Sequence, residues 1–330
     1  MKILITGATG FIGQRLYPAL LNQGHTLYAT QRPTPSSSQL PADLHPIPID
    51  DTLTPKAPLP PLDAVIHLAA RAHILNDSSP DPEADFFKVN TQGTLNLAKA
   101  ALAASAQHFI FISSIGAMAT LSPQRLTETS PCQPDTPYGR SKLAAEQALI
   151  DLAQDSSMAY TILRPTLVYG PGNPGNMERL LKLIQRRLPL PLGAIHNQRS
   201  LVYVDNLVDA ILTSLHHSQA QNQLFLVSDG QDLSTPELIR QLAGYLQCSA
   251  PLLPIPPALM QLAGRLTGKT NTVSRLTSSL AVDSAKIRHT LHWHPPYSVE
   301  QGLQATAAWF LKYQQLSRSP TNGFTSTPDS

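Results

Sequence analysis

A short apolar strand followed at once by three evenly spaced glycines opens the chain and limits its fold more than any other feature. Residues 1–13 read MKILITGATGFIG, and Gly7, Gly10 and Gly13 directly follow the apolar run. Apolar residues then recur at helical spacing as far as residue 21. A glycine turn between a strand and a helix lets the backbone approach a pyrophosphate, and the helix N-terminus adds unpaired N–H groups. The pattern therefore predicts a dinucleotide-binding unit.

A tyrosine and a lysine four residues apart supply the second signal. Tyr138 and Lys142 stand at the start of a segment with helical character, so they share one helix face, one turn apart. The pKa of an isolated tyrosine is about 10, and a nearby ammonium group favours the phenolate and lowers this pKa. The pair is therefore a candidate for general acid–base chemistry near neutral pH.

A strand that ends in two hydroxyl groups completes the candidate catalytic set. The apolar run 108–112 is followed by Ser113 and Ser114. Ligands of a parallel doubly wound sheet lie outside the carboxyl ends of its strands. At least one of these hydroxyls is therefore expected to face the cofactor.

Strands and helices alternate through the first half, which predicts an α/β fold with a doubly wound parallel (Rossmann) sheet. The predicted strands lie near residues 2–6, 26–30, 63–68, 108–113 and 159–164. The predicted helices lie near residues 11–23, 84–104 and 140–154. Prolines are dense between residues 31 and 62, which leaves room for a short strand at 46–49 but for no long helix.

The character of the chain changes after residue 168, where Gly/Pro turns give way to mainly helical patterns. We expect residues 1–168, with about 200–230 returning, to form the dinucleotide-binding domain. Residues 169–199 and 231–314 are expected to form a smaller substrate-binding lobe. The polar, proline-containing tail 315–330 is expected to be disordered.

Composition excludes several classes of partner. A net charge of +2 over 330 residues gives no electrostatic case for nucleic acid or an acidic membrane. No apolar run is long enough to span a bilayer and no secretory signal precedes the first strand, so we expect a cytoplasmic protein without membrane insertion. Cys132 and Cys248 lack metal or redox spacing. His289, His292 and His294 have no cysteine companion, so no metal site is predicted.

Together, these motifs resemble the extended short-chain dehydrogenase/reductase family, in its nucleotide-sugar branch of NAD-dependent epimerase/dehydratase type. Further segments match the family in order. Residues 63–70 resemble its fourth strand and the loop beneath the cofactor, 89–97 its central helix, 163–172 and 199–207 its substrate-side strands, and 293–303 its C-terminal signature. The resemblance extends from Met1 to about Tyr313.

The resemblance implies roles for individual residues in hydride transfer at a sugar carbon. Ser114 would polarise the reacting oxygen, Tyr138 would pass the proton, and Lys142 would lower the pKa of the tyrosine and bind the nicotinamide ribose. The implied cofactor contacts are Gly7, Gly10, Phe11, Ile12, Gly13, Thr30, Arg32, Asp50, Leu68, Ala69, Ala70, Asn90, Tyr138 and Lys142. The implied substrate contacts are Ser114, Asn176 and Arg199, of which the arginine suits a diphosphate.

The end of the second strand bears on the choice of cofactor. An Asp or Glu there would hydrogen-bond the ribose 2′-hydroxyl of NAD, but none is present. Thr30 and Arg32 stand there instead, and both suit a 2′-phosphate. NADP(H) is therefore favoured, with NAD(H) as the alternative.

Reduction of a 4-keto nucleotide sugar, of the UDP-4-keto-6-deoxy-N-acetylhexosamine type, fits this cofactor pattern. Residues 175–206 also resemble enzymes of bacterial polysaccharide assembly, so this 4-ketoreductase activity in polysaccharide or O-antigen precursor synthesis is the favoured function. A UDP-sugar 4-epimerase with tightly bound NAD is the main alternative. Residues 117–119 read Ala-Met-Ala where such epimerases usually have Val-Tyr-Gly, which disfavours it.

Two further alternatives fit less well. A 4,6-dehydratase needs an Asp-Glu pair directly after the catalytic hydroxyl, where this chain has Ile115 and Gly116. A non-catalytic dinucleotide-binding redox sensor typically loses the catalytic tyrosine or lysine, and both are present. The resemblance also allows a homodimer formed through a four-helix bundle that includes the helix of Tyr138.

Overall fold

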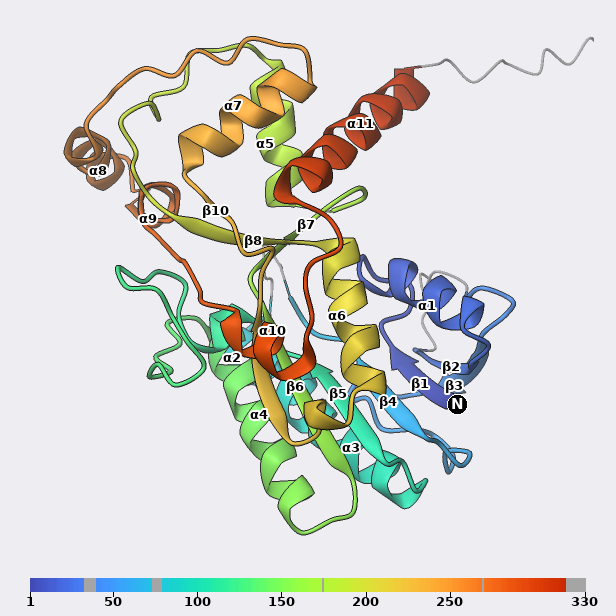
Figure 1. The fold of residues 1–330 in the computed structure, drawn as a ribbon. Helices are drawn as coiled ribbons and strands as arrows, with labels where there is room; N and C mark the ends of the chain where they lie inside the picture. Colours follow the sequence, from blue (N-terminus) through green and yellow to red (C-terminus); the bar gives the residue numbers. More distant parts are fainter. Residues whose placement is uncertain (33–39, 73–78, 174, 269, 319–330) are drawn as a thin grey trace, which may run out of the picture.

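The computed structural model describes residues 1–32, 40–72, 79–173, 175–268 and 270–318. Its strands are β1 (Lys2–Thr6), β2 (Thr26–Gln31), β3 (His45–Pro48), β4 (Ala64–His67), β5 (His108–Ile112), β6 (Ala159–Pro165), β7 (Leu167–Tyr169), β8 (Arg199–Tyr203), β9 (Gln223–Val227) and β10 (Asp232–Leu233). They form a seven-stranded parallel sheet of order β3-β2-β1-β4-β5-β6-β9 and a three-stranded sheet of order β10-β8-β7 (Figure 1).

Helices surround both sheets. The α-helices are α1 (Gly13–Asn22), α2 (Pro82–Phe86), α3 (Gly93–Ala103), α4 (Pro137–Gln154), α5 (Asn176–Gln185), α6 (Val204–His216), α7 (Thr235–Tyr245), α8 (Pro257–Leu266), α9 (Thr270–Thr277), α10 (Ala285–Leu291) and α11 (Val299–Arg318). A π-helix, η1 (Phe87–Gln92), joins α2 to α3, and two short 3₁₀ turns, η2 (Ile115–Ala117) and η3 (Ser218–Ala220), follow β5 and α6. Among the described residues, no helix is long and apolar enough to cross a bilayer.

The inner strands β1, β4 and β5 of the large sheet are buried on both faces. Ile3 and Ile5 of β1 belong to an apolar cluster with residues of α1 and α6, whereas Leu4 between them belongs to a second cluster with residues of α3 and α4. Successive side chains of a strand point to opposite faces, so a sheet covered on both sides needs unbroken apolar runs. The predicted α/β doubly wound parallel sheet is confirmed.

The proline-rich stretch behaves as its composition predicts. The described residues between β2 and β4 contain one short strand of the large sheet, β3, and no helix. Helix 84–104, predicted as one element, is instead divided into α2, η1 and α3. The widened turn lies around Asn90, whose side chain binds other segments of the chain, as described below.

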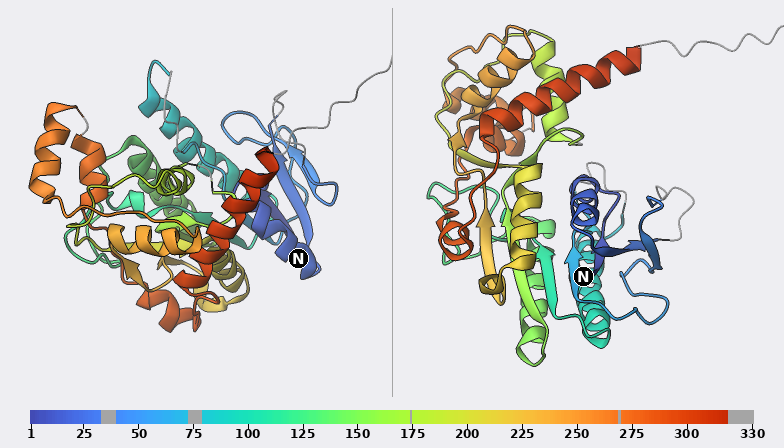
Figure 2. Two further views of the ribbon diagram at one scale, coloured as in Figure 1. Left: turned by 90° about the horizontal axis from the view of Figure 1, so that it is seen from above. Right: turned by 45° about the vertical axis from the view of Figure 1, so that its right-hand side comes forward.

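The upper part of the molecule is built around the small sheet and α5, α7 and α11 (Figure 2). From the sequence, residues 200–230 are expected to return to the dinucleotide domain. Within them, β9 pairs with β6 in the large sheet, whereas β8 pairs with β7 and β10 in the small sheet. Helix α11 extends to Arg318, so the predicted tail begins no earlier than residue 319, and 319–330 lie outside the described residues. The division into domains stays a prediction.

One buried histidine of the sheet is held neutral by its neighbours. His108 is 6% exposed, and its Nε2 lies 2.7 Å from Thr161 Oγ1 on the adjacent strand. The Thr161 hydroxyl donates its proton to the carbonyl oxygen of Ala220, so it accepts from His108, which must carry its proton on Nε2. Burial lowers the pKa of His108 from 6.5 to about 4.

We predict that His108→Gln reduces the loss of stability in acid. In the unfolded chain His108 takes up a proton near pH 6.5, and in the folded protein it does so only near pH 4. Its contribution to the free energy of unfolding is therefore present above pH 6.5 and is lost as the pH falls towards 4. This loss of stability is about 3 kcal/mol. Glutamine donates the same hydrogen bond without titrating. Denaturant unfolding at neutral and acidic pH should show a smaller decrease in the free energy of unfolding for the variant than for the wild type. An equal decrease would contradict the assignment of His108 as a buried neutral residue.

Candidate active site

The glycine turn lies where the large sheet reverses its winding, between β1 and β4, the position at which such sheets bind ligands. Gly7 has a φ of +71°, and a Cβ added there would lie 3.1 Å from the backbone nitrogen of Ala69. A Cβ on Gly13, the first residue of α1, would lie 2.2 Å from the carbonyl oxygen of Gly7. Gly10 donates its N–H to the same oxygen. The tight, side-chain-free turn fits the pyrophosphate of a dinucleotide.

A buried hydrogen-bond chain fixes the loop opposite this turn. Thr6 Oγ1 accepts from the backbone N–H groups of Leu68 and Ala69, so its own proton goes to His67 Nδ1 at 2.6 Å. His67 is therefore neutral and donates from Nε2 to Thr94 Oγ1. Burial, together with the charge of Lys142, lowers the pKa of His67 well below its usual range. The loop expected beneath the cofactor is thus tied to β1.

Asn90 of η1 links the same loop to the helix of the candidate tyrosine. Its side-chain oxygen accepts from Arg71 N, and its amide donates to the carbonyl oxygen of Arg71 and to Ser141 Oγ. Ser141 in turn donates to the carbonyl oxygen of Tyr138. Asn90 is 1% exposed, so these contacts satisfy an otherwise buried amide. It acts here as a positioning residue between the loop and α4.

Ser114 and Tyr138 lie together at the carboxyl end of β5. Ser114 caps η2 by accepting from Gly116 N at 3.0 Å, and a Cβ added to Gly116 would lie 3.3 Å from Ser114 Oγ and 3.7 Å from the Tyr138 ring. A Cβ on Gly139 would lie 2.1 Å from the carbonyl oxygen of Gly116, so only glycine lets α4 begin this close to η2. The glycine after the tyrosine therefore brings the two hydroxyl groups together.

Lys142 lies on α4, one turn after Tyr138, and its side chain is buried. Its Nζ donates to the carbonyl oxygen of Ile112 at 2.7 Å and lies 4.1 Å from the ring centre of Phe111. Burial lowers the pKa of Lys142 to about 7, and the nearby Glu146 opposes this shift. The pKa of Tyr138 is raised by burial, and the hydrogen bond with Ser114 is the contact that lowers it. The predicted lowering of that pKa by Lys142 stays a prediction.

A buried ion pair supports α4 from below. Glu146 binds Arg164 of β6 through both carboxylate oxygens and also accepts from Ser113. Both charged side chains are at most 4% exposed. Ser113 therefore points into this support, and Ser114 is the serine that faces Tyr138.

The predicted cofactor contacts at the sheet edge lie apart from this group. Thr30 is half-buried at the end of β2, and Arg32 is exposed directly after that strand. Asp50 is exposed, and its Oδ1 accepts from the backbone of Thr54 and from Thr52. These hydrogen bonds lower the pKa of Asp50. Asp50 thus caps its own turn, and its adenine contact stays a prediction.

The two predicted substrate contacts outside the catalytic group belong to the upper part of the molecule. Asn176 is the exposed first residue of α5. Arg199 starts β8, and its Nη1 donates to the carbonyl oxygens of Arg275 and Ser278. The structure does not bring either residue to Ser114 and Tyr138, and their substrate roles stay predictions. In contrast, Phe11 and Ile12 of the glycine turn pack against the apolar cluster of the upper part.

Sequence reasoning missed the buried polar partners that hold the site in place. Thr6 and His67 are 61 residues apart and meet only because β1 pairs with β4 in that register. Glu146 carried a usable signal, because it follows Lys142 by four residues on the helix face that already holds Tyr138. Among the described residues, no group of three metal-binding side chains could hold a metal ion.

Comparisons with known proteins agree with this geometry. A family model described as the NAD dependent epimerase/dehydratase family matches residues 3–227. A UDP-glucose 4-epimerase of Vibrio cholerae is 41% identical over 326 residues, covering 94% of this chain and 96% of that protein. The N-acetyl-alpha-D-glucosaminyl-diphospho-ditrans,octacis-undecaprenol 4-epimerase of Escherichia coli O157:H7 is 28% identical over 322 residues, covering 92% of this chain and 94% of that protein.

A solved structure gives the same fold at lower identity. The Bordetella bronchiseptica enzyme WbmG, in complex with NAD and UDP, has a TM-score of 0.73 and 22% identity. The match covers 94% of this chain and 95% of that chain. The likeness extends through both the large sheet and the upper part of the molecule.

We predict that Gly13→Ala weakens dinucleotide binding at least about tenfold and lowers the free energy of unfolding by about 1–3 kcal/mol. The new Cβ would collide with the carbonyl oxygen of Gly7, so the turn would have to open. Gly244→Ala is the matched control, because a Cβ there meets nothing within 4 Å on α7. Fluorescence titration with NADH and denaturant unfolding measure both quantities. Equal affinity of the two variants would contradict the assigned cradle.

Proposed function

The chain belongs to the NAD dependent epimerase/dehydratase family, and from this premise we propose that it is a nucleotide-sugar 4-epimerase that keeps NAD bound through its reaction. The observation that carries the proposal is the 41% identity, across nearly the whole of both chains, with a protein named UDP-glucose 4-epimerase. A second relative of similar coverage is named as a 4-epimerase of a sugar diphosphate. UDP-glucose is therefore the first substrate to test.

The described residues fit the cofactor. Gly7 and Gly13 leave the pyrophosphate room beside the N-terminus of α1, and the N–H groups of Leu68 and Ala69 are held by Thr6, which keeps the facing loop in place. NAD, when bound, supplies a hydride acceptor and, once reduced, a hydride donor. The preference for NADP(H) that Thr30 and Arg32 suggest has no support among the relatives named above, so NAD(H) is the proposed cofactor.

Tyr138 and Ser114 have the chemistry that inversion of a sugar hydroxyl requires. In the proposed reaction, the Tyr138 phenolate would take the proton of the 4-hydroxyl as the hydrogen on the sugar carbon leaves as a hydride. It would return the proton to the same oxygen when the hydride comes back to the opposite face of that carbon. Ser114 donates a hydrogen bond to the same oxygen. In the proposed mechanism Lys142 is the group that favours the phenolate, and in this structure its Nζ donates to the carbonyl oxygen of Ile112.

Reduction of a 4-keto nucleotide sugar is the second candidate function. Its specific support is the absence of an acidic residue after β2 and the presence of Thr30 and Arg32 there. The catalytic group would be the same, but the cofactor would have to exchange after each turnover. Dimer formation and a cytoplasmic location stay predictions for either function.

We expect the purified chain to convert UDP-glucose to its 4-epimer without added cofactor. Tyr138→Phe should lower turnover by about 10²–10⁴-fold while NAD binding is kept, because the ring remains and the proton-carrying hydroxyl is lost. Chromatography of the nucleotide sugars measures the turnover. Unchanged turnover in the variant would contradict the mechanism. Absence of interconversion, with NADPH consumed on a 4-keto nucleotide sugar, would favour the second candidate.

Gly139→Ala should lower kcat by about 10–10²-fold, because a displacement of about 1 Å between reacting groups costs that much. The added Cβ pushes the start of α4 away from Gly116 and so separates Tyr138 from Ser114. Gly244→Ala again serves as the control, and it should leave kcat unchanged. Equal kcat in the two variants would show that the close approach of α4 to η2 is not needed for catalysis.

A further inference from the structure

Helix α8 turns a row of leucines to solvent. Leu259, Leu262 and Leu266 are 56%, 54% and 81% exposed, and their spacing of three and four residues places them on one helix face. We call these three residues the leucine face. Met260 and Gly264 lie on the neighbouring face and are buried, the glycine against Val273 of α9. The helix therefore packs against α9 with one side and leaves its leucine side uncovered.

Further exposed apolar side chains lie in the adjoining segments. Leu276 of α9 is 38% exposed, and Leu253, shortly before α8, is 46% exposed. Single exposed leucines are ordinary on protein surfaces, but a contiguous set marks an interaction site. The α8–α9 pair lies at the outer edge of the upper part of the molecule, well away from the large sheet (Figures 1 and 2).

The segment that carries the leucine face has charge of one sign. Residues 238–282 contain no aspartate or glutamate. Their basic residues are Arg240, Arg265, Arg275 and Lys269, of which Lys269 lies outside the described residues. Arg265 and Arg275 are exposed on α8 and α9. No acidic membrane partner is expected from the net charge of the whole chain, because that charge is only +2. That total hides the purely basic charge of residues 238–282.

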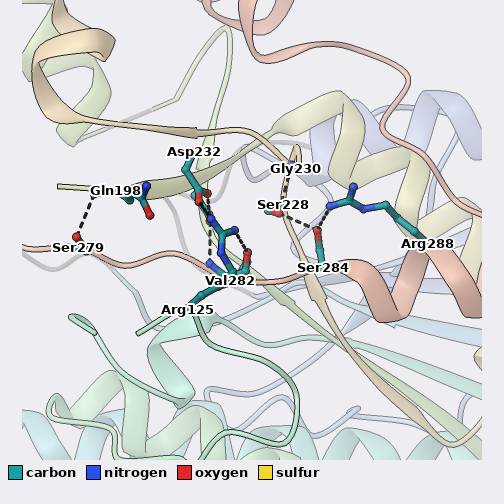
Figure 3. Close-up of polar contacts among 10 residues, drawn as sticks. Arg125, Gln198, Ser228, Gly230, Asp232, Ser279, Val282, Ser284 and Arg288 are labelled. Atoms are coloured by element: carbon teal, nitrogen blue, oxygen red, sulfur yellow. Dashed lines mark hydrogen bonds and ion pairs between the residues drawn. The ribbon is translucent and has the colours of Figure 1, made fainter. Parts of the chain in front are cut away.

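The base of the helix pair is held firmly. Asn197 donates to the carbonyl oxygens of Leu276 and Ser278, and Arg199 binds the end of α9 as described above. The chain after α9 is held in turn by Gln198 N bound to Ser279 Oγ and by contacts of Arg125 with Asp232 and the Val282 carbonyl (Figure 3). These contacts fix the C-terminal end of α9, against which α8 packs through Gly264 and Val273.

We propose that the α8–α9 pair docks on the surface of an anionic lipid bilayer. The leucine face would enter the boundary between headgroups and acyl chains, and Arg265 and Arg275 would meet the anionic headgroups. Helix α8 has 10 residues, and a spanning helix needs about 20, so the contact is peripheral. A second copy of the chain is a poorer occupant. A two-fold contact would bring the same arginines of both copies together with no acidic residue in the segment to pair them.

Sedimentation of the full chain with lipid vesicles tests the proposal. We expect binding to vesicles of phosphatidylethanolamine and phosphatidylglycerol, and little binding to phosphatidylcholine vesicles. Leu259→Ser/Leu262→Ser/Leu266→Ser should lower the bound-to-free ratio at least about tenfold. Arg265→Gln/Arg275→Gln should do the same on the anionic vesicles alone.

Tyr313→Ser is the matched control, because Tyr313 is 50% exposed on α11, away from the leucine face, and its loss should leave vesicle binding unchanged. Circular dichroism and turnover of a soluble substrate verify that each variant is folded. No binding of the wild-type chain to anionic vesicles would overturn the proposal, as would a triple leucine variant that binds like the wild type. Self-association that disappears in the triple variant, without vesicle binding, would assign the leucine face to a second copy and overturn it too.

Discussion

The carbonyl oxygen of Gly7 occupies the place where any other residue at position 13 would put its Cβ, and the dinucleotide cradle depends on this contact. It sets how closely α1 can follow β1, and the positive φ of Gly7 lets the turn pass Ala69. The Thr6 hydroxyl then holds the facing loop by two backbone N–H groups. A pyrophosphate is recognised mainly by backbone in such sites, so the geometry of the turn matters more than any side chain.

Helix α4 carries this constraint to the reacting groups. Tyr138, Lys142 and Glu146 follow one another at intervals of four residues and share one face. Glu146 anchors that face to Arg164, while Gly139 lets the first turn touch η2 and bring Tyr138 to Ser114. A glycine thus lies close to a carbonyl oxygen at both places: Gly13 against Gly7 in the cofactor turn, and Gly139 against Gly116 beside Ser114 and Tyr138.

The sequence predicted what depends on local pattern, and missed what depends on pairing across the sheet. Glycine spacing, apolar runs and the Tyr138–Lys142 interval are short-range signals. They predicted the parallel sheet, which is confirmed, and the catalytic roles of Tyr138 and Lys142, which stay predictions. The His67 chain and the Glu146–Arg164 pair join segments that only the folded topology brings together. The orientation of Lys142 towards the Ile112 carbonyl was equally beyond reach, because a spacing places a residue on a helix face without fixing where its side chain ends. The small sheet formed by β7, β8 and β10 arises in the same way.

The identity of the dinucleotide that co-purifies with the chain tests the central claim most directly. An epimerase regenerates its cofactor within one turnover and has no need to exchange it. Mass spectrometry and absorbance of the denatured protein should therefore find NAD at about one molecule per chain. A protein that is purified without a dinucleotide and takes up NADPH more tightly than NADH would contradict the account, because a cofactor that must exchange belongs to a reductase.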